Sequence, residues 1–293
     1  MEDTARISSG QIEAEVSRLG AQLMSLKAGG TECLWQGDPR WWPRRAPVLF
    51  PIVGNLRGDH ATSARGEIRL GRHGLARNEE FSLVEREENR VLLELESNEG
   101  TRRSFPYDFR LRLSYAIDES SLVQGFEVTN TGSHDLPYVL GGHPAFNVPA
   151  VGASDGFDAY RLEFAEPWTY AAPRIDVSTG LLDFQDRPPL LDGCSVLPLT
   201  HRTFDVDTLV FEDVPQRRVR LVGPEGHGIR VDFAGFDYLG VWSAAGDAPF
   251  VALEPWTGCA TAEDEDDVFE HKRGMRLLSP GQTDRLSFVV TPF

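Results

Sequence analysis

Apolar and polar residues alternate with a period of two along much of this chain. In the segment FRLRLSYAI (109–117) every odd-numbered residue is apolar, and the residues between them are Arg, Arg, Ser and Ala. Because successive side chains of a β-strand point to opposite faces, this pattern predicts a strand with one buried face. The same reasoning predicts strands in QIEAEVS (11–17), VLLELES (91–97), SLVQGFEVTN (121–130), RVRLV (218–222), GIRVDFAG (228–235) and DRLSFVV (284–290).

Short turn signals rich in Gly, Pro and Asn separate these segments. The best short candidate for a helix is EDEDDVFEHKRG (263–274), although its acidic run is more simply explained as a solvated surface. Many strands joined by short turns, without crossover helices, predict antiparallel sheets packed face to face. The sequence shows no repeat, linker or break in composition, so we expect one all-β sandwich domain over residues 1–293, with few short helices.

The net charge of the chain disfavours two classes of binding partner, nucleic acids and anionic membranes. The formal net charge is −16, whereas a nucleic-acid-binding protein presents a basic surface, and anionic membranes repel an acidic chain. The N-terminal segment has no apolar stretch of the kind found in signal peptides, and the sequence contains no apolar run long enough to span a membrane. We therefore expect a cytoplasmic protein without nucleic-acid or membrane partners, and leave open whether it is a monomer or a homodimer.

The cysteines and histidines lack the spacing of metal sites. Cys33, Cys194 and Cys259 lie far apart, and the sequence contains no CxxC, HxH or HExxH motif. The pattern favours neither a zinc knuckle nor a disulfide framework. We expect no bound metal.

The segment GGHPAFNVP (141–149) holds a titratable residue in a constrained setting. Pro144 biases His143 toward extended backbone geometry, and the two glycines before it let the main chain approach another part of the protein closely. This arrangement suits the wall of a pocket. A single histidine of this kind is also found as a hydrogen-bonded core residue.

The segment FVALEPW (250–256) places a carboxylate on an apolar strand. Glu254 shares the face of Phe250 and Ala252. Burial there disfavours the charged carboxylate unless a cation or a hydrogen-bond donor lies near it. The alternative interpretation is a glutamate at a strand end whose carboxylate reaches water.

Other polar residues offer donors and acceptors for a ligand rich in oxygen atoms, and each is equally compatible with a surface loop. They are Arg72, His73 and Arg77 in GRHGLARNEEF (71–81), Arg57 after APVLFPIVG (46–54), and Asp207 in FDVDTLVFED (204–213).

Taken in order along the chain, these motifs resemble the aldose 1-epimerase family, also called galactose mutarotases, and within it the LacX-like branch. The resemblance covers nearly the whole chain and implies a large antiparallel β-supersandwich with a sugar-binding cleft, a reaction that interconverts the anomers of a hexose, and no cofactor or metal. The motifs are RLGAQLMSL (18–26), LFPIVGNLRG (49–58), GRHGLARNEEF (71–81), GGHPAFNVP (141–149), DTLVF (207–211) and ALEPWTG (252–258).

The resemblance also implies roles for individual residues. His143 would be the general acid of ring opening and Glu254 the general base. His73 would contact sugar hydroxyls or the ring oxygen, with Arg57 and Asp207 at binding positions. We expect the acid and the base to face the sugar from opposite sides, and their nearness to favour the charged form of each.

Two further interpretations remain beside a mutarotase of free sugars. The family often has an arginine directly after the glycine of LFPIVG, where this chain has Asn55, so the identity of the sugar-binding arginine stays open. The HGLAR string with Arg77 is also similar to hexose-6-phosphate mutarotases, in which arginines hold the phosphate. The other interpretation is a non-catalytic sugar sensor on the same fold.

Overall fold

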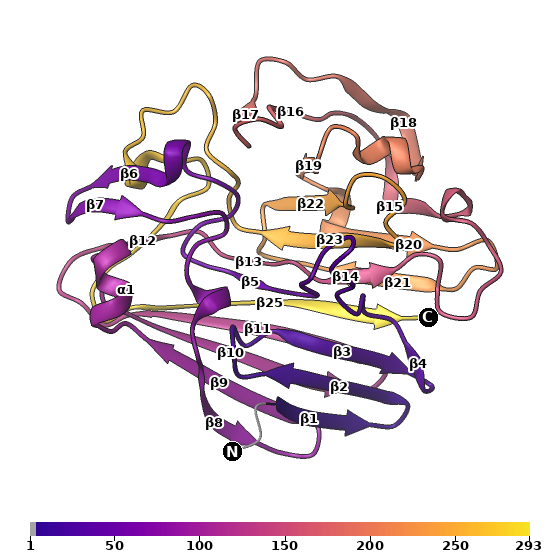
Figure 1. The fold of residues 1–293 in the computed structure, drawn as a ribbon, viewed down its shortest axis with the longest axis horizontal. Coiled ribbons are helices and arrows are strands. Elements are labelled where there is room, and N and C mark those ends of the chain that lie inside the picture. The colour runs from indigo at the N-terminus through magenta and orange to yellow at the C-terminus, as the bar shows by residue number, and fades with distance from the viewer. Residues whose placement is uncertain (1–3) are drawn as a thin grey trace.

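Strands account for most of the regular structure in the computed structural model, which describes residues 4–293 (Figure 1). Strand β10 (Phe109–Asp118) covers the segment with the clearest alternation, and its five apolar residues at odd positions are buried. Strands β11 (Ser121–Asn130) and β20 (Arg218–Val222) match two predicted segments at both ends. The period of two therefore predicts the strands and also the faces that they bury.

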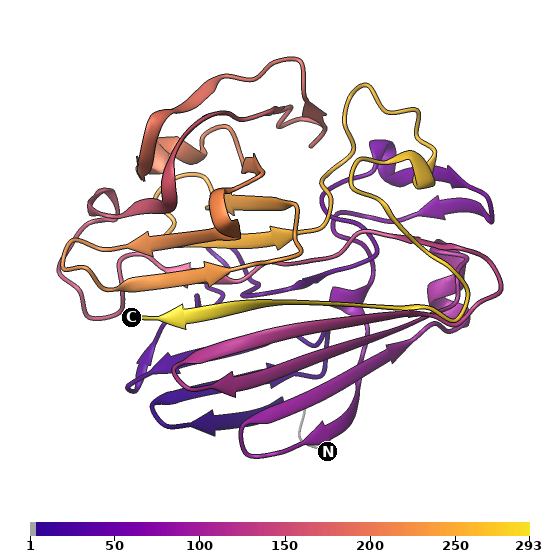
Figure 2. The ribbon, with the colours of Figure 1, turned by 180° about the vertical axis from the view of Figure 1, so that it is seen from behind.

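The largest sheet has nine strands, and all its neighbouring strands are antiparallel. In order across the sheet they are β18 (Pro189–Pro198), β15 (Arg161–Ala171), β20, β21 (Gly228–Asp232), β25 (Thr283–Pro292), β11, β10, β9 (Arg90–Glu96) and β8 (Ser82–Arg86). The C-terminal strand β25 thus lies in the middle of the sheet and joins segments that are far apart in sequence (Figures 1 and 2).

A four-stranded sheet packs over β9 and β10. The buried hydroxyl of Tyr115 on β10 donates a hydrogen bond of 2.7 Å to the carbonyl of Ala21, which ties the two layers together. Apolar residues of both sheets belong to one cluster of buried side chains that runs from Ala5 to Val290. This cluster supports a single domain, which stays a prediction. The strands of the smaller sheet are β1 (Thr4–Ser9), β2 (Ile12–Ser17), β3 (Leu23–Ala28) and β4 (Thr31–Glu32).

A six-stranded sheet forms the part of the fold that carries the cavity described below. Its central strand is β23 (Phe250–Trp256), in which all seven residues are buried. In order, the sheet contains β19 (Leu209–Glu212), β22 (Tyr238–Trp242), β23, β13 (Gly141–Gly142) and β5 (Val48–Leu49), and β14 (Ala145–Asn147) also pairs with β23. Three strand pairs complete the structure: β6 (His60–Ser63) with β7 (Gly66–Arg69), β12 (Leu136–Tyr138) with β24 (Arg276–Leu278), and β16 (Arg174–Ile175) with β17 (Leu182–Asp183).

Helices in the described part of the chain are short, as predicted. The α-helix α1 (Glu99–Ser104) begins after Asn98, whose side chain accepts hydrogen bonds from the backbone amides of Gly100 and Thr101. The remaining helices are single 3₁₀ turns: η1 (Arg57–Asp59), η2 (Ala76–Asn78), η3 (Phe157–Ala159), η4 (His201–Phe204), η5 (Pro215–Arg217) and η6 (Phe269–His271).

The segment 263–274 is a loop in which only the single turn η6 is helical, and the preferred interpretation, an exposed acidic run, holds for Glu263, Asp264 and Asp266. Its acidic side chains bind basic partners instead of lining one face of a helix. Asp267 pairs with Arg57 at 3.0 Å, and Glu265 pairs with the buried ammonium of Lys272 at 3.3 Å. These ion pairs fix the course of the segment on either side of the single turn η6.

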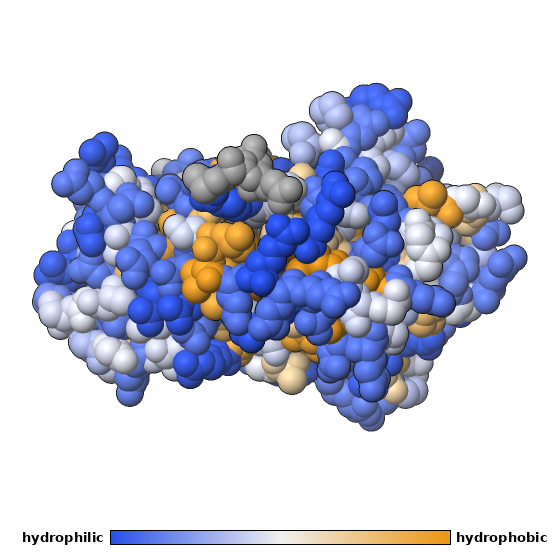
Figure 3. Space-filling view, turned by 90° about the horizontal axis from the view of Figure 1, so that it is seen from below, coloured by the Kyte–Doolittle hydropathy of each residue, from blue (hydrophilic) through white to orange (hydrophobic). Residues whose placement is uncertain are grey.

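The face seen from below is mainly hydrophilic, with hydrophobic residues gathered near its centre (Figure 3). No helix among residues 4–293 is long and apolar enough to cross a membrane. The predicted all-β architecture, an antiparallel supersandwich with few short helices, is confirmed.

Candidate active site

A cavity of about 190 Å³ lies against β22 and β23. Its walls come from these strands, from the connection between β13 and β14, and from loops that are far apart in the sequence. Five of the six site residues predicted from the sequence line it: His73, Arg77, His143, Asp207 and Glu254. The size suits one small molecule, and its walls combine aromatic rings with charged and polar groups.

The strand pairing around β23 brings His143 beside Glu254. Strands β13 and β14 both pair with β23, and His143 lies in the short connection between them. A Cβ atom at Gly141 would lie 2.6 Å from Trp256 Cδ1 and 2.7 Å from the carbonyl oxygen of Pro255. Glycine is therefore required for this close approach, which is the function that we predicted for the glycine pair.

His143 and Glu254 are in direct contact. Nε2 of His143 lies 3.3 Å from Oε1 of Glu254, and the two residues are 6% and 1% exposed. The indole Nε1 of Trp256 donates a hydrogen bond of 3.2 Å to Oε2 of the same carboxylate. This differs from the expected placement on opposite sides of a sugar. Since both oxygens at the anomeric carbon of a sugar are bonded to one atom, a contacting pair is able to reach both.

Burial controls the protonation of this pair. Burial, assisted by the positive charges of Arg77 and Arg72 and opposed by a hydrogen bond to the main chain of His143, lowers the pKa of His143 to about 3. Burial also raises the pKa of Glu254 well above its ordinary value, against the effect of the hydrogen bond from Trp256. Both shifts favour the neutral side chains, whereas we expected the charged forms. The reason is that the cost of removing each charge from water exceeds the attraction between the partners.

His73 presents a hydrogen-bond donor to the cavity. Its backbone has a φ of 66°, an unusual conformation for a residue other than glycine. The conformation is held by Gly54, whose carbonyl accepts from the His73 amide at 2.8 Å and whose amide donates to His73 Nδ1 at 3.1 Å. Because Nδ1 accepts, the neutral ring carries its proton on Nε2. Burial lowers the pKa of His73 well below its ordinary value, which keeps the ring neutral.

Asp207 brings a carboxylate to another wall of the cavity. Its φ is 72°, and its Oδ1 accepts a hydrogen bond of 2.9 Å from the hydroxyl of Thr208. The negative charge of Asp207 contributes to the raised pKa of Glu254. Asp207 is thus an acceptor close enough to Glu254 for its charge to act on that carboxylate.

Positively charged guanidinium groups also line the cavity or lie beside it. Arg72 Nε donates to Oδ1 of Asn55 at 3.0 Å, and Arg77 Nε is buried without a hydrogen-bond partner among the described residues. Arg44 donates to the carbonyl of Arg77 at 3.3 Å. Burial, together with the neighbouring charges of Arg44 and Arg72, lowers the pKa of Arg77 to about 10.

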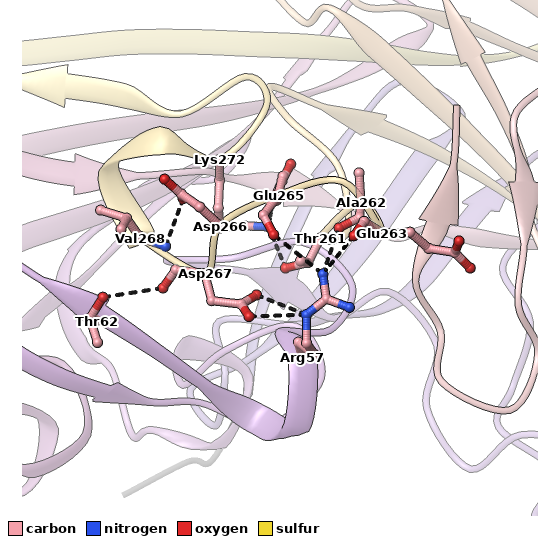
Figure 4. A network of polar contacts seen from close by, with 10 residues as sticks. All are labelled: Arg57, Thr62, Thr261, Ala262, Glu263, Glu265, Asp266, Asp267, Val268 and Lys272. Carbon is pink, nitrogen blue, oxygen red and sulfur yellow. Dashed lines mark hydrogen bonds and ion pairs between the residues drawn. The ribbon is translucent and has the colours of Figure 1, made fainter. Parts of the chain in front are cut away.

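Arg57 is not among the residues that line the cavity, and its side chain points toward the loop that contains Asp267 (Figure 4). Its Nε is 3.1 Å and 3.0 Å from the two carboxylate oxygens of Asp267, and its Nη2 donates to the carbonyls of Ala262 and Glu263. The amide of Thr62 donates to the carbonyl of Asp267 at 2.9 Å. Arg57 therefore links the loop of residues 262–267, which is distant in sequence, to the region of η1 and β6. We assign it this structural role in place of the sugar contact that the resemblance implied.

Trp42 also lines the cavity, although sequence reasoning did not assign it to a site. Trp42 comes from a segment rich in Gly, Pro and Arg with no clear period, so its position follows only from the tertiary structure. Arg72, which belongs to the same polar segment as His73 and Arg77, lines the cavity as well. Residues 4–293 contain no group of three His, Cys, Asp or Glu side chains arranged to hold a metal ion.

Comparison of the sequence with known families gives one match over nearly the whole chain. A sequence model of the family described as aldose 1-epimerase matches residues 3–289. Two proteins of Lactococcus lactis subsp. lactis, the plasmid and the chromosomal Protein LacX, are each 37% identical to this chain. Both alignments cover 98% of this chain and 99% of the relative.

Solved structures with the same fold cover the chain equally well. A galactose mutarotase related enzyme from Lactobacillus acidophilus has a TM-score of 0.93 and 29% identity, over 99% of this chain and 97% of its own. A galactose mutarotase-like protein from Lactobacillus casei ATCC 334 has a TM-score of 0.90 and 28% identity, over 99% of this chain and 100% of its own. Sequence and fold are therefore shared with these proteins over nearly their whole length.

Proposed function

This chain belongs to the aldose 1-epimerase family, and on that basis we propose that it is an isomerase that interconverts the α and β anomers of a hexose. The observation that carries the proposal is the contact of 3.3 Å between His143 Nε2 and Glu254 Oε1 at the wall of one cavity. Opening a sugar ring requires one group that accepts a proton and another that donates one, both within hydrogen-bond reach of the anomeric centre.

In the ring-opening step, Glu254 accepts the proton of the C1 hydroxyl and His143 gives a proton to the ring oxygen. The C1–O5 bond breaks with its electron pair on O5, and C1 becomes the carbonyl carbon of an open-chain aldehyde. Rotation about the C1–C2 bond presents the other carbonyl face. Ring closure then returns one proton from O5 to His143 and the other from Glu254 to O1. Each group contributes about 10²–10⁴-fold to the rate.

The starting state needs the shared proton on His143. The neutral pair that burial favours differs from this state only in the position of that proton, which moves between two atoms in contact. Hydrogen bonds to the carboxylate favour its ionised form. Trp256 supplies one such bond at 3.2 Å, and hydroxyls of a bound sugar add others. Sugar binding is thus expected to move the proton toward His143.

The remaining polar walls orient the sugar in this proposal. His73 offers its Nε2–H to a sugar oxygen, and Asp207 accepts from a hydroxyl. The rings of Trp242 and Trp256 also line the cavity and cover the apolar face of the sugar.

Anomer exchange measured by one-dimensional NMR tests this function. The protein should speed the exchange of at least one free or phosphorylated hexose well above the rate in buffer. The rival interpretation, a sugar sensor, predicts binding without faster exchange.

A second candidate substrate class is a hexose 6-phosphate. Arg72 and Arg77 line the cavity and Arg44 contacts Arg77, while the chain as a whole carries a net charge of −16. Such a local positive group favours an anionic ligand, because guanidinium groups match phosphate oxygens. Comparing KM for glucose and glucose 6-phosphate tests this candidate. A lower KM for the phosphate ester, lost in Arg77→Gln, supports it, and equal values contradict it.

A further inference from the structure

The imidazole of His143 lacks the usual second hydrogen bond of a catalytic histidine. Its Nε2 meets Glu254, but its buried Nδ1 forms no hydrogen bond of regular geometry among residues 4–293, and besides Glu254 the main chain of His143 itself acts on the ring and raises its pKa. In many proton-transferring histidines the second ring nitrogen is bound to a carboxylate or a carbonyl, which fixes the orientation of the ring. The orientation of His143 must therefore have another source.

Aromatic rings surround His143 instead. The indole of Trp42 stacks on the imidazole, with ring centroids 4.7 Å apart and planes inclined by 25°. Trp242 and His73 approach the imidazole edge-on, at 5.6 Å and 5.5 Å with planes inclined by 84° and 86°. Trp42 and Trp242 also touch each other, at 5.3 Å and 77°. Rotation of the His143 side chain about its Cα–Cβ or Cβ–Cγ bond would disturb these contacts.

Trp42 is itself held firmly in its loop. Its carbonyl accepts a hydrogen bond of 2.9 Å from the indole of Trp35, and its amide donates to the carbonyl of Asp38 at 3.0 Å. Its ring also stacks on Phe250 of β23, with centroids 5.8 Å apart. The same strand carries Glu254, so Trp42 places His143 relative to the strand that bears its partner.

The stack also favours one charge state of His143. The face of an indole ring is electronegative and attracts a cation placed over it. The charged and titratable groups near the imidazole act differently: Glu254 attracts its positive form, whereas Arg72, Arg77 and burial oppose it. His73 is kept neutral. Trp42 thus adds to the stability of the imidazolium form that the proposed reaction uses.

We propose that Trp42 is a positioning residue that holds the His143 ring against Glu254 by stacking, in place of a hydrogen bond to Nδ1. The inference rests on the proposed function. In this inference Trp42 lines the cavity and also affects the reaction rate indirectly, by holding His143 in place.

A double-mutant cycle tests this coupling. Trp42→Leu should lower kcat about tenfold, with a change in KM below about threefold. In a His143→Asn background the same substitution should change kcat less than about twofold, because the ring that it positions is gone. Trp42→Phe, which keeps a flat ring, should recover most of the rate. The matched control is Trp41→Leu, at the neighbouring half-buried position outside the cavity lining, with an expected change below about twofold.

An NMR titration of the His143 ring protons supplies a readout that does not depend on catalysis. Trp42→Leu should lower the pH at which His143 takes up its proton by about half a unit, and Trp41→Leu should leave it unchanged. Equal losses of kcat in both backgrounds, or an unchanged His143 titration in Trp42→Leu, would overturn the inference. If the wild-type protein does not speed anomer exchange at all, the proposed function fails, and the titration alone decides whether Trp42 acts on His143.

Discussion

The indole of Trp256 donates a hydrogen bond of 3.2 Å to the carboxylate of Glu254, two residues before it on β23. Side chains at positions i and i+2 of a strand share a face, so the strand itself supplies a donor to its own buried acid. The bond favours the ionised carboxylate and acts against burial, which raises the pKa of Glu254. In the proposed mechanism, this hydrogen bond from Trp256 helps Glu254 to act as the base.

Replacing this donor should change the pH dependence of catalysis. Trp256→Phe keeps an aromatic ring but removes the hydrogen bond, so the pKa of Glu254 should rise further. The ionised fraction at a given acidic pH then falls, and the acidic limb of kcat/KM should move to higher pH by about one unit. The measurement is anomer exchange across a pH series. An unmoved acidic limb would show that this limb does not report Glu254.

Arg57 should matter for stability and leave sugar binding unchanged. Arg57→Ala removes the ion pair with Asp267 and the hydrogen bonds to two carbonyls. Because the ion pair is partly exposed, we expect a loss of about 1 kcal/mol in the free energy of unfolding, measured by urea denaturation. KM for the sugar should stay within about twofold. A large rise in KM at unchanged stability would return Arg57 to the sugar-binding role implied by the family resemblance.

The close approach of β13 to β23 depends on a missing side chain. In Gly141→Ala the new Cβ would meet the carbonyl of Pro255 and the ring of Trp256, at 2.7 Å and 2.6 Å before any relaxation. We expect a loss of about 1–3 kcal/mol in stability, with lower activity because His143 follows two residues later. Gly156→Ala is the matched control, since a Cβ there meets no atom within 4 Å. Equal stability of the two variants would show that β13 tolerates displacement.

The strands were predictable because their signal is local. The alternation in 109–117 and 121–130 identifies each strand and its buried face without any knowledge of its partners. The segment 263–274, the best short candidate for a helix, contains only the single turn η6, and acidic residues there bind cations from other parts of the fold, such as Arg57. Sequence patterns of charge do not reveal such long-range partners.

The sequence predicted which residues belong to the site, but it did not predict how they are arranged. Motifs pointed to His143 and Glu254, but their contact depends on how β13 and β14 pair with β23. The expectation of two charged groups failed because their burial follows from that pairing. Trp42 was missed since stacking between a loop residue and a distant imidazole leaves no periodic trace in the sequence.

The most direct test of the account is the rate of anomer exchange, followed by NMR, in Glu254→Gln, His143→Asn and the double variant. Each single substitution should lower kcat by about 10²–10⁴-fold. Because the two side chains act as one unit, the double variant should be little slower than the slower single variant. Near wild-type exchange by Glu254→Gln, in a protein that still folds and binds sugar, would contradict the assignment of the acid–base pair.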